Sequence, residues 1–557
     1  METLKYLLLF FYYCFLELIF LFVPKSWLLK NIEEEIVLIT GAGRGLGKAL
    51  AVKFSGLVKH VILWDIDESA LKETAKLVKQ RGGNATYYVV DVSNRRMVCE
   101  TKNKVQSEVG TVSILVNSAS ISKGKYFQNL NDEDIAKTFE VNTYSMFWMH
   151  KAFLPEMMKE NKGHCLLIGD ASTFTSGGYN SDFMASKAAV AGFFESLVLE
   201  LRDANYNGVH FTIACPFFKA NKDSKKKKNG NKEKLYSVAE QIIDEMRQNR
   251  EIVILPKSLY IYNTLTTMLP MKACYLFIIL CCFPRSLLYK DIRKDRVLIT
   301  GAGNGLGKSI ALEMSKHVSQ LILWDIDIEA VKETARLVKN DGGQCYYYEV
   351  DVSNIDNVFE TAQKVKQEVG KVDILVNNAG VVCGKRLLDL SESEIKNTFN
   401  VNTFAHYWLY KAFLPEMIAE NYGHIVTVTS VVSYLSGYQV SDYVSSKSAS
   451  TALFEALSIE LKQDGYSGIN LTLVCPYWMN TRMFKGAESE FLNAVEPEYV
   501  AREIIKGIRS NQEIVFIPRV FKFLLSISSL MPLSSRYALF VALGYDSFMN
   551  SFQNRSS

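Results

Sequence analysis

An internal repeat constrains this chain more than any other feature of its sequence. The segment V-L-I-T-G-A-G-R-G-L-G-K that begins at Val37 recurs at Val297 with one change, and L-W-D-I-D occurs at both Leu63 and Leu323. Both pairs have the same offset of 260 residues (297 − 37). Solenoid repeats have periods of about 20–50 residues, so this period is far too long for one. The chain therefore contains a duplicated whole domain, although its 557 residues alone would suggest three to four domains.

Composition excludes several other classes of protein. The net charge of +4 gives no basic surface of the kind that binds nucleic acid, and we expect no nucleic-acid partner. A hydrophobic content of 48% with 22% charged residues is typical of globular folding and not of disorder. The ten cysteines and seven histidines show no metal-ligand spacing. We expect a reduced compartment and no metal.

Short apolar runs alternate with helix-length segments in both copies. This alternation is typical of βαβ units around a parallel sheet that is buried on both faces. The sequence therefore predicts an α/β protein with two tandem doubly wound, Rossmann-type domains. The expected divisions are a hydrophobic anchor at 1–30, a degenerate first domain at 31–257, an apolar linker at 258–290 and a competent second domain at 291–557. The runs that predict strands are Ile36–Thr40, Val61–Trp64, Tyr87–Val90, Ile114–Asn117, Val297–Thr300, Leu321–Trp324, Tyr346–Val350, Ile374–Asn377 and Ile425–Thr429.

Each copy opens with a glycine-rich turn between its first strand and the following helix. Glycines let the backbone approach a pyrophosphate, and the helix N-terminus presents free N–H groups to it. An acidic residue ends the next strand, where a carboxylate accepts hydrogen bonds from ribose hydroxyls and repels a 2′-phosphate. NAD is therefore favoured over NADP, more firmly in the second copy, where Asn304 takes the place of Arg44. The residues concerned are Gly41, Gly45, Gly47 and Asp65 in the first copy and Gly301, Gly305, Gly307 and Asp325 in the second.

Further motifs in the second copy carry a family resemblance. T-G-x-x-x-G-x-G from Thr300, D-V at Asp351, N-N-A-G at Asn377, and Y-x-x-x-K from Tyr443 to Lys447 together resemble a short-chain dehydrogenase/reductase. The strings L-W-D-I-D, G-H-I-V-T-V-T-S and C-P-Y-W-M-N-T narrow the likeness. They are similar to the membrane-associated branch that contains 17β-hydroxysteroid dehydrogenases of lipid droplets and epidermal-type retinol dehydrogenases. The resemblance implies a lipophilic alcohol or carbonyl substrate and a location at the endoplasmic reticulum or the lipid droplet.

The second copy has the residues that alcohol oxidation requires. A tyrosine phenol can take the hydroxyl proton only if cationic neighbours stabilise the phenolate, and Lys447 lies one helical turn after Tyr443. The resemblance implies that Ser430 hydrogen-bonds the reacting oxygen. It also implies that Asn402 holds a helix kink and a water of the proton relay. The cofactor contacts that it implies are Gly301, Asn304, Gly305, Leu306, Gly307, Asp325, Asp351, Val352, Asn377, Ala379, Gly380, Lys447, Pro476 and Thr481.

The first copy departs from this pattern at the reacting groups. Phe183 stands where the second copy has Tyr443, and Asp170 where it has Ser430. N-N-A-G becomes N-S-A-S at 117–120, and the threonine at 481 becomes Asn221. Lys187, Asn142, Asp65, Asp91 and the glycine-rich turn remain. We expect dinucleotide contacts at Gly41, Gly45, Gly47, Asp65 and Asp91 but no catalysis.

The segments that would cover a substrate also differ between the copies. The second copy continues after Pro476 with the compact string N-T-R-M-F-K-G. The first copy instead runs into residues 219–234, a lysine-rich stretch that predicts disorder. This stretch is either a solvated loop or a polybasic contact with anionic lipid headgroups.

Two apolar stretches predict attachment to a membrane. Tyr6–Val23 is interrupted only by Glu17 and is just long enough to span a bilayer, so that a span and an interfacial or hairpin insertion both remain open. Ala273–Phe283 is too short to span, which would keep both domains on one face of the membrane.

The sequence as a whole favours a membrane-bound, NAD-dependent alcohol dehydrogenase that is active in its second copy. The first copy would dock on the second as an intrachain pseudo-dimer partner, or the chain would form a homo-oligomer. One alternative is a non-catalytic, dinucleotide-binding membrane scaffold. Another is a short-chain reductase or epimerase with a different lipid substrate.

Overall fold

The computed structural model contains two compact units. Residues 28–255 belong to one unit and residues 289–528 to the other. The structure describes residues 28–171, 180–217, 228–255, 289–435, 437–484, 494–528 and 535.

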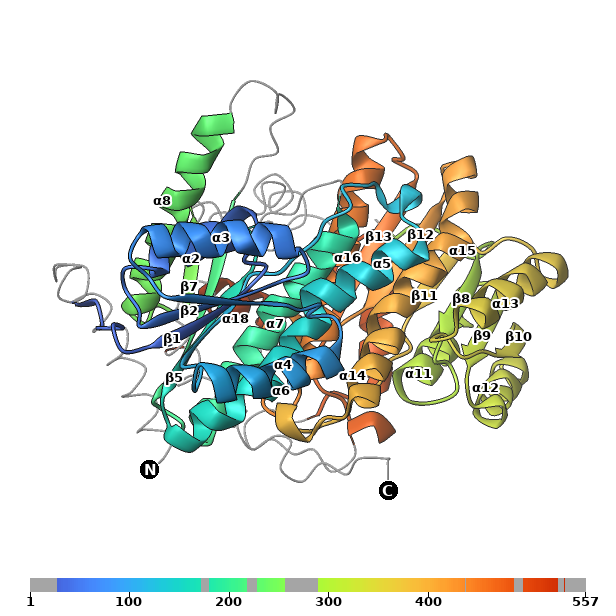
Figure 1. Ribbon diagram of the computed structural model, residues 1–557. Coiled ribbons are helices and arrows are strands. Elements are labelled where there is room, and N and C mark those ends of the chain that lie inside the picture. Colours follow the sequence, from blue (N-terminus) through green and yellow to red (C-terminus); the bar gives the residue numbers. More distant parts are fainter. Residues whose placement is uncertain are drawn as a thin grey trace. The chain divides into compact units, whose positions relative to one another are not determined.

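The first unit contains a seven-stranded parallel sheet in the order β3-β2-β1-β4-β5-β6-β7. Helices cover both faces of the sheet, with α2 packed beside α8 and α4 beside α6 (Figure 1). The strands are β1 Ile36–Thr40, β2 His60–Asp65, β3 Ala85–Val89, β4 Ile114–Asn117, β5 Gly163–Ile168, β6 Val209–Pro216 and β7 Ile252–Leu255. The helices are α2 Gly45–Phe54, α3 Glu68–Gln80, α4 Arg95–Glu108, α5 Asp132–Phe139, α6 Ser145–Glu160, α7 Ser181–Asp203 and α8 Lys228–Arg247.

The second unit repeats this sheet in the order β10-β9-β8-β11-β12-β13-β14, again all parallel. The strands are β8 Arg296–Thr300, β9 Gln320–Asp325, β10 Gln344–Glu349, β11 Ile374–Asn377, β12 Gly423–Val428, β13 Ile469–Pro476 and β14 Ile514–Ile517. The helices are α11 Gly305–Met314, α12 Ile328–Asn340, α13 Ile355–Glu368, α14 Glu392–Phe399, α15 Ala405–Glu420, α16 Ser441–Gln463, α17 Pro497–Arg509 and α18 Val520–Ser528.

The prediction of two doubly wound α/β domains is confirmed, since both sheets are parallel and wound in both directions from β1 and β8. The predicted runs Ile36–Thr40, Ile114–Asn117 and Ile374–Asn377 coincide with β1, β4 and β11. The other predicted strands differ from the observed ones by one or two residues at their ends, because burial and pairing register set strand ends as much as apolar character does. The sequence analysis did not single out β5, β6, β7, β13 and β14.

The cores explain why apolar runs became central strands. Val37, Leu38 and Ile39 of β1 are fully buried, as are Val297 and Ile299 of β8. Alternate residues of such a strand point to opposite faces, so complete burial requires helices on both sides of the sheet. Each core also brings strand residues against the helix that follows the glycine-rich turn, which fixes that turn beside the sheet edge.

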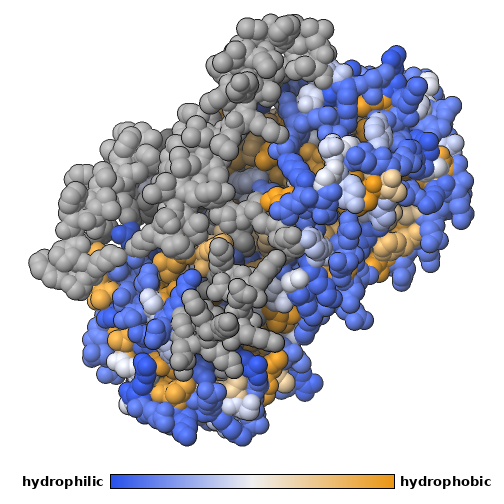
Figure 2. Space-filling view, turned by 90° about the horizontal axis from the view of Figure 1, so that it is seen from above, coloured by the Kyte–Doolittle hydropathy of each residue, from blue (hydrophilic) through white to orange (hydrophobic). Residues whose placement is uncertain are grey.

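One part of the lysine-rich stretch differs from the prediction of disorder. Residues 228–234 form the first turns of α8, so that the helix takes up the C-terminal part of the stretch. Residues 219–227 lie outside the described ranges, and so do both predicted membrane segments. Within the described ranges, no helix combines the length and the apolar character needed to cross a bilayer. Figure 2 shows a described surface that is mostly hydrophilic, with apolar residues in smaller patches.

Candidate active site

A large cavity lies in the second unit where the sheet changes direction. Strand order reverses between β8 and β11, and the crevice outside the carboxyl ends of such strands is the usual ligand site of doubly wound sheets. The cavity has a volume of about 760 Å³ and extends from the glycine-rich turn to Tyr443 on α16. This volume is in the range of pockets that hold small organic ligands.

The glycine-rich turn at the start of α11 tolerates no side chain at its tightest points. A Cβ at Gly307 would lie 2.0 Å from the carbonyl oxygen of Gly301, and a Cβ at Gly303 would lie 2.9 Å from Asp325 Oδ2. Gly301 and Gly305 have φ angles of +66° and +52°, which side chains disfavour. The turn therefore exposes backbone at the N-terminus of α11, as a pyrophosphate cradle requires.

Asp325 is held at the end of β9 by backbone donors. Its Oδ2 accepts a hydrogen bond from the N–H of Gly303 at 2.7 Å, and its Oδ1 accepts one from Asp327 at 2.9 Å. Because the carboxylate still lines the cavity, it can receive hydrogen bonds from ribose hydroxyls. Its charge also opposes a phosphate at the same place.

Tyr443 and Ser430 both line this cavity. Burial raises the pKa of the Tyr443 phenol to about 12, and a hydrogen bond with Ser430 partly opposes that rise. Ser430 lies two residues after the end of β12. Its Oγ donates a hydrogen bond to the carbonyl oxygen of Pro476 at 3.4 Å. A phenol and a hydroxyl that line the same cavity can provide a proton-transfer group and an orienting donor for one substrate oxygen.

Lys447 lies beneath the phenol, one turn further along α16. Its Nζ donates a hydrogen bond to the carbonyl of Val428 at 3.1 Å and lies 5.9 Å from the centre of the Tyr443 ring. Burial lowers the pKa of Lys447 to about 8. The ammonium present at pH 7 favours the phenolate form of Tyr443.

Asn402 lies in a π-helical segment, Asn400–Phe404, between α14 and α15. Its side chain joins this segment to the loop after β11 and to α16. The amide oxygen accepts a hydrogen bond from the N–H of Val381 at 2.9 Å, while the amide nitrogen donates to the Val381 carbonyl at 2.9 Å and to Ser446 at 3.0 Å. The resemblance led us to expect a helix kink here, and a π-bulge of this kind is common at functional sites.

The cavity wall around the phenol is mainly apolar. Val440, Tyr443 and Val444 form a buried cluster that Val382, Val432 and Phe484 contact. The ring of Phe484 meets that of Tyr443 edge to face, with centroids 6.2 Å apart. This part of the cavity therefore suits an apolar ligand that carries few polar atoms.

Most of the residues predicted from the sequence line this one cavity, but two do not. Asn377 is 1% exposed at the end of β11, beneath the cavity, and Asn402 acts from behind the wall. Asn378, which the sequence did not lead us to expect at the site, lines the cavity and donates hydrogen bonds to the carbonyls of Thr300 and Gly301. Asn378 is the second residue of the N-N-A-G motif, which could have pointed to it. The predicted residues at the cavity are Gly301, Asn304, Gly305, Leu306, Gly307, Asp325, Asp351, Val352, Ala379, Gly380, Ser430, Tyr443, Lys447, Pro476 and Thr481.

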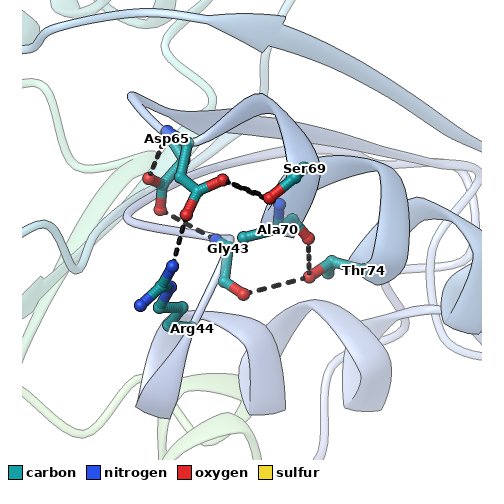
Figure 3. A network of polar contacts seen from close by, with 7 residues as sticks. Gly43, Arg44, Asp65, Ser69, Ala70 and Thr74 are labelled. Atoms are coloured by element: carbon teal, nitrogen blue, oxygen red, sulfur yellow. Dashed lines mark hydrogen bonds and ion pairs between the residues drawn. The ribbon is translucent and has the colours of Figure 1, made fainter.

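The first unit retains the glycine-rich turn with nearly the same geometry. Gly41 and Gly45 have φ angles of +65° and +54°, and the N–H of Gly43 donates to Asp65 Oδ2 at 2.9 Å. Figure 3 shows this network, in which Asp65 reaches the turn from β2. Asp91, after β3, accepts hydrogen bonds from the backbone and side chain of Ser93.

Arg44 distinguishes this turn from that of the second unit. Its guanidinium forms an ion pair with Asp67, 2.5 Å away, at the start of α3. Asp67 also accepts hydrogen bonds from Ala70 and Ser69, and these, with Arg44, lower its pKa to about 2. The Arg44 side chain is 80% exposed, so this pair lies at the surface of the turn.

The reacting end of the first unit keeps its lysine but not its phenol. Lys187 donates to the carbonyl of Ile168 at 2.9 Å and lies 5.7 Å from the centre of the Phe183 ring. Burial lowers the pKa of Lys187 to about 8, and the charge of Asp170 opposes this change. Asn142 makes the same three hydrogen bonds as Asn402, to Ile121 and Ser186. The scaffold of the site is thus intact, without a proton-transfer group at position 183.

The described part of the chain contains no set of side chains suited to hold a metal ion. No group of three or more His, Cys, Asp or Glu side chains there could hold a metal ion. The fold, the glycine-rich turn and the Tyr–Lys–Ser arrangement define instead a dinucleotide-dependent oxidoreductase.

Comparison with known proteins assigns the family. The short chain dehydrogenase family model matches residues 35–231 and 295–491, once in each copy, and the chain belongs to this family. It is therefore a short-chain dehydrogenase/reductase, an oxidoreductase that acts on CH–OH groups with NAD(P).

Each of the curated relatives matches a part of this chain that is about as long as one copy. Epidermal retinol dehydrogenase 2 of Mus musculus is 38% identical over 250 residues, covering 44% of this chain and 81% of the relative. Estradiol 17-beta-dehydrogenase 11 of Homo sapiens is 40% identical over 243 residues, with the same coverage. A solved short chain dehydrogenase/reductase from Burkholderia phymatum in complex with NAD is 24% identical, with a TM-score of 0.39, covering 42% of this chain and 93% of that one.

Proposed function

We propose that the second copy oxidises a lipophilic alcohol, retinol-like or hydroxysteroid-like, to its carbonyl with NAD. The observation that carries the proposal is that Tyr443, Lys447 and Ser430 line the same cavity as the glycine-rich turn. The names of the curated relatives, a retinol dehydrogenase and an estradiol dehydrogenase, support this substrate class. The apolar wall formed by Val382, Val440 and Phe484 supports it as well.

The residues at the cavity divide the reaction between them. NAD⁺, when bound, supplies the ring that accepts a hydride from the carbinol carbon. Ser430 orients the substrate hydroxyl, and Tyr443 takes its proton, so that the alcohol loses one hydride and one proton and becomes a carbonyl. The ammonium of Lys447 stabilises the phenolate, and Asn402 joins the π-helical segment behind it to Val381 and to Ser446 on α16.

Asp325 supports NAD as the preferred cofactor. Its carboxylate points into the cavity beside the glycine-rich turn, where a 2′-phosphate of NADP would meet a like charge. Asn304, at the turn, supplies no cation to offset that repulsion.

The first copy, in this proposal, does not catalyse. Phe183 has no proton to exchange, and the carboxylate of Asp170 stands where a hydroxyl would orient the substrate. Its retained turn, with Asp65 and Asp91, supports dinucleotide contacts without turnover. Its retained scaffold supports a role as an intrachain pseudo-dimer partner of the second copy.

We also propose attachment to the endoplasmic reticulum or lipid-droplet membrane. The support is the apolar character of residues 6–23 and 273–283. A lipophilic alcohol would be drawn from the same membrane.

The proposal is tested with the full chain purified in detergent. NAD⁺-dependent oxidation of all-trans-retinol and of estradiol is measured for the wild type, Tyr443→Phe and Phe183→Tyr. We expect oxidation of at least one alcohol, its loss in Tyr443→Phe and little change in Phe183→Tyr. Binding of NADH without turnover of either alcohol would favour the scaffold alternative. Turnover of other carbonyl compounds alone would favour a different substrate class.

A further inference from the structure

We propose that Tyr438, held in place by Arg386, is a polar contact in the substrate cavity and selects alcohols that carry a second oxygen besides the reacting hydroxyl. This inference rests on the proposed function, and it separates two substrate classes that the proposal leaves together. Retinol has a single oxygen, whereas a hydroxysteroid such as estradiol has one at each end of a rigid apolar body.

The two side chains are joined by two contacts. Arg386 Nη2 donates a hydrogen bond to the Tyr438 hydroxyl, and the guanidinium carbon lies 5.6 Å from the centre of the Tyr438 ring. Tyr438 lines the cavity and is 5% exposed. Because its oxygen accepts from a cation, the phenol O–H is polarised and becomes a stronger donor to an acceptor in the cavity.

The surroundings make this donor selective. Val382, Val432 and Val440 line the same cavity as Tyr438 and pack around the reacting phenol. A substrate oxygen that leaves water for such a wall loses free energy unless a hydrogen bond replaces its hydration. Sites built around a buried polar partner therefore reject analogues that lack the matching oxygen much more strongly than apolar sites reject a change of one methylene.

The first copy supports a link between this pair and catalysis. Tyr126 stands where the second copy has Arg386, and Gly178 where it has Tyr438. The copy without the reacting phenol thus also lacks both members of the pair. Glu394, by contrast, has a counterpart acidic residue in Asp134, so the loss is not a general decay of polar side chains in this region.

The two residues have different roles in the proposal. Tyr438 contacts the substrate and determines specificity. Arg386 acts through Tyr438 as a positioning residue, since its guanidinium lies against the ring and orients the hydroxyl by a hydrogen bond.

The test compares estradiol with 3-deoxyestradiol, which keeps the reacting 17β-hydroxyl and lacks the remote one. The full chain oxidises each with NAD⁺, and the ratio of the two kcat/KM values is the readout. We expect the wild type to prefer estradiol at least 10-fold. In Tyr438→Phe the preference should fall to within about twofold of unity, mainly through a higher KM for estradiol.

Arg386 is tested with Arg386→Met and the conservative Arg386→Lys. We expect the methionine variant to lose most of the preference and the lysine variant to recover part of it, because an ammonium still donates but does not stack in the same way. Matched controls are Tyr347→Phe on β10 and Arg336→Met on α12, both outside the cavity and expected to keep the wild-type ratio. Turnover of 3-deoxyestradiol, which should stay near the wild-type rate in each variant, reports that the second unit is folded.

The outcomes separate this inference from the proposed function. Oxidation of both alcohols by the wild type without a preference would overturn the inference alone, and so would a preference that survives in Tyr438→Phe. Oxidation of neither alcohol would overturn the proposed hydroxysteroid-like function, and the inference with it. The comparison of the two alcohols with the wild type uses no variant. It therefore tests the inference even if a variant fails to fold.

Discussion

The ammonium nitrogen of Lys447 lies 5.9 Å from the centre of the Tyr443 ring, while that of Lys187 lies 5.7 Å from the centre of the Phe183 ring. Both lysines donate to a carbonyl at the end of the preceding strand, Val428 or Ile168. The position of the lysine is therefore a property of the fold and does not depend on the phenol. The two rings, Tyr443 and Phe183, differ by one hydroxyl group, and in the proposed reaction this hydroxyl is the group that exchanges a proton with the substrate.

The Tyr443→Phe variant should lose turnover while it keeps its cofactor. We expect kcat to fall by about 10²–10⁴-fold, because general acid–base catalysis contributes this much and phenylalanine cannot take a proton. The dissociation constant for NADH, measured by fluorescence titration, should stay within about twofold of the wild type. Lys187→Ala in the first copy is the matched control and should leave turnover within a few-fold. If Lys187→Ala abolished turnover and Tyr443→Phe did not, the first copy and not the second would be the catalytic one.

Asp325→Ser should shift cofactor preference toward NADP. The wild type should use NAD⁺ with the higher kcat/KM, and the substitution should narrow or invert the ratio by removing a like charge near the 2′-phosphate. Steady-state kinetics with both cofactors at a saturating alcohol concentration measures this ratio. Asp65→Ser, the equivalent change in the first copy, should leave it unchanged. Equal or better efficiency of the wild type with NADP⁺ would contradict the role given to Asp325.

Lys187→Met should change how the stability of the first unit depends on pH. Burial lowers the pKa of Lys187 from 10.5 to about 8, so between these values the unfolded chain binds a proton that the folded chain has lost. Stability rises with pH wherever the unfolded state binds more protons. The free energy of unfolding of the wild type should therefore rise relative to Lys187→Met by about 1.4 kcal/mol per pH unit from pH 8 to 10.

Denaturant unfolding of both chains at several pH values measures this difference. At and below pH 8 the buried ammonium imposes its full cost, of the order of 3 kcal/mol, on the wild type alone. Lys104→Met, at an exposed position of α4, is the control and should show no such slope. A constant difference across the range would mean that Lys187 keeps its proton in the folded state.

A chain that begins at Met271 should be impaired if the first copy serves as a docking partner. Two copies on one chain have a high effective concentration for each other, so removal of one should lower the melting temperature or the activity of the other. Adding the first copy in trans should restore part of the loss. A shortened chain as stable, as active and as membrane-associated as the full one would make the first copy a passenger.

Much of the architecture could be predicted from the sequence, because the repeat, the apolar runs and the glycine-rich turn are each recognised from residues close together in the chain. The repeat at Val37 and Val297 established two copies, and the buried apolar runs predicted parallel sheets. The glycine-rich turn and Asp325 were legible because only glycine fits the close approaches at Gly303 and Gly307. The exact strand ends were not predicted, because burial and pairing register set them as much as apolar character does. The helical start of α8 at Lys228 was not predicted either.

The sequence by itself determined that the chain has two doubly wound copies and which of them carries Tyr443, Lys447 and Ser430. Tertiary structure alone decided that Asn378 and not Asn377 faces the cavity. It also decided that Tyr438 meets Arg386, 52 residues away in the chain. The physical reason is the range of the interactions. Backbone turns and burial patterns are set by near neighbours in the chain, whereas a cavity wall is assembled from segments that the sheet brings together at its carboxyl edge.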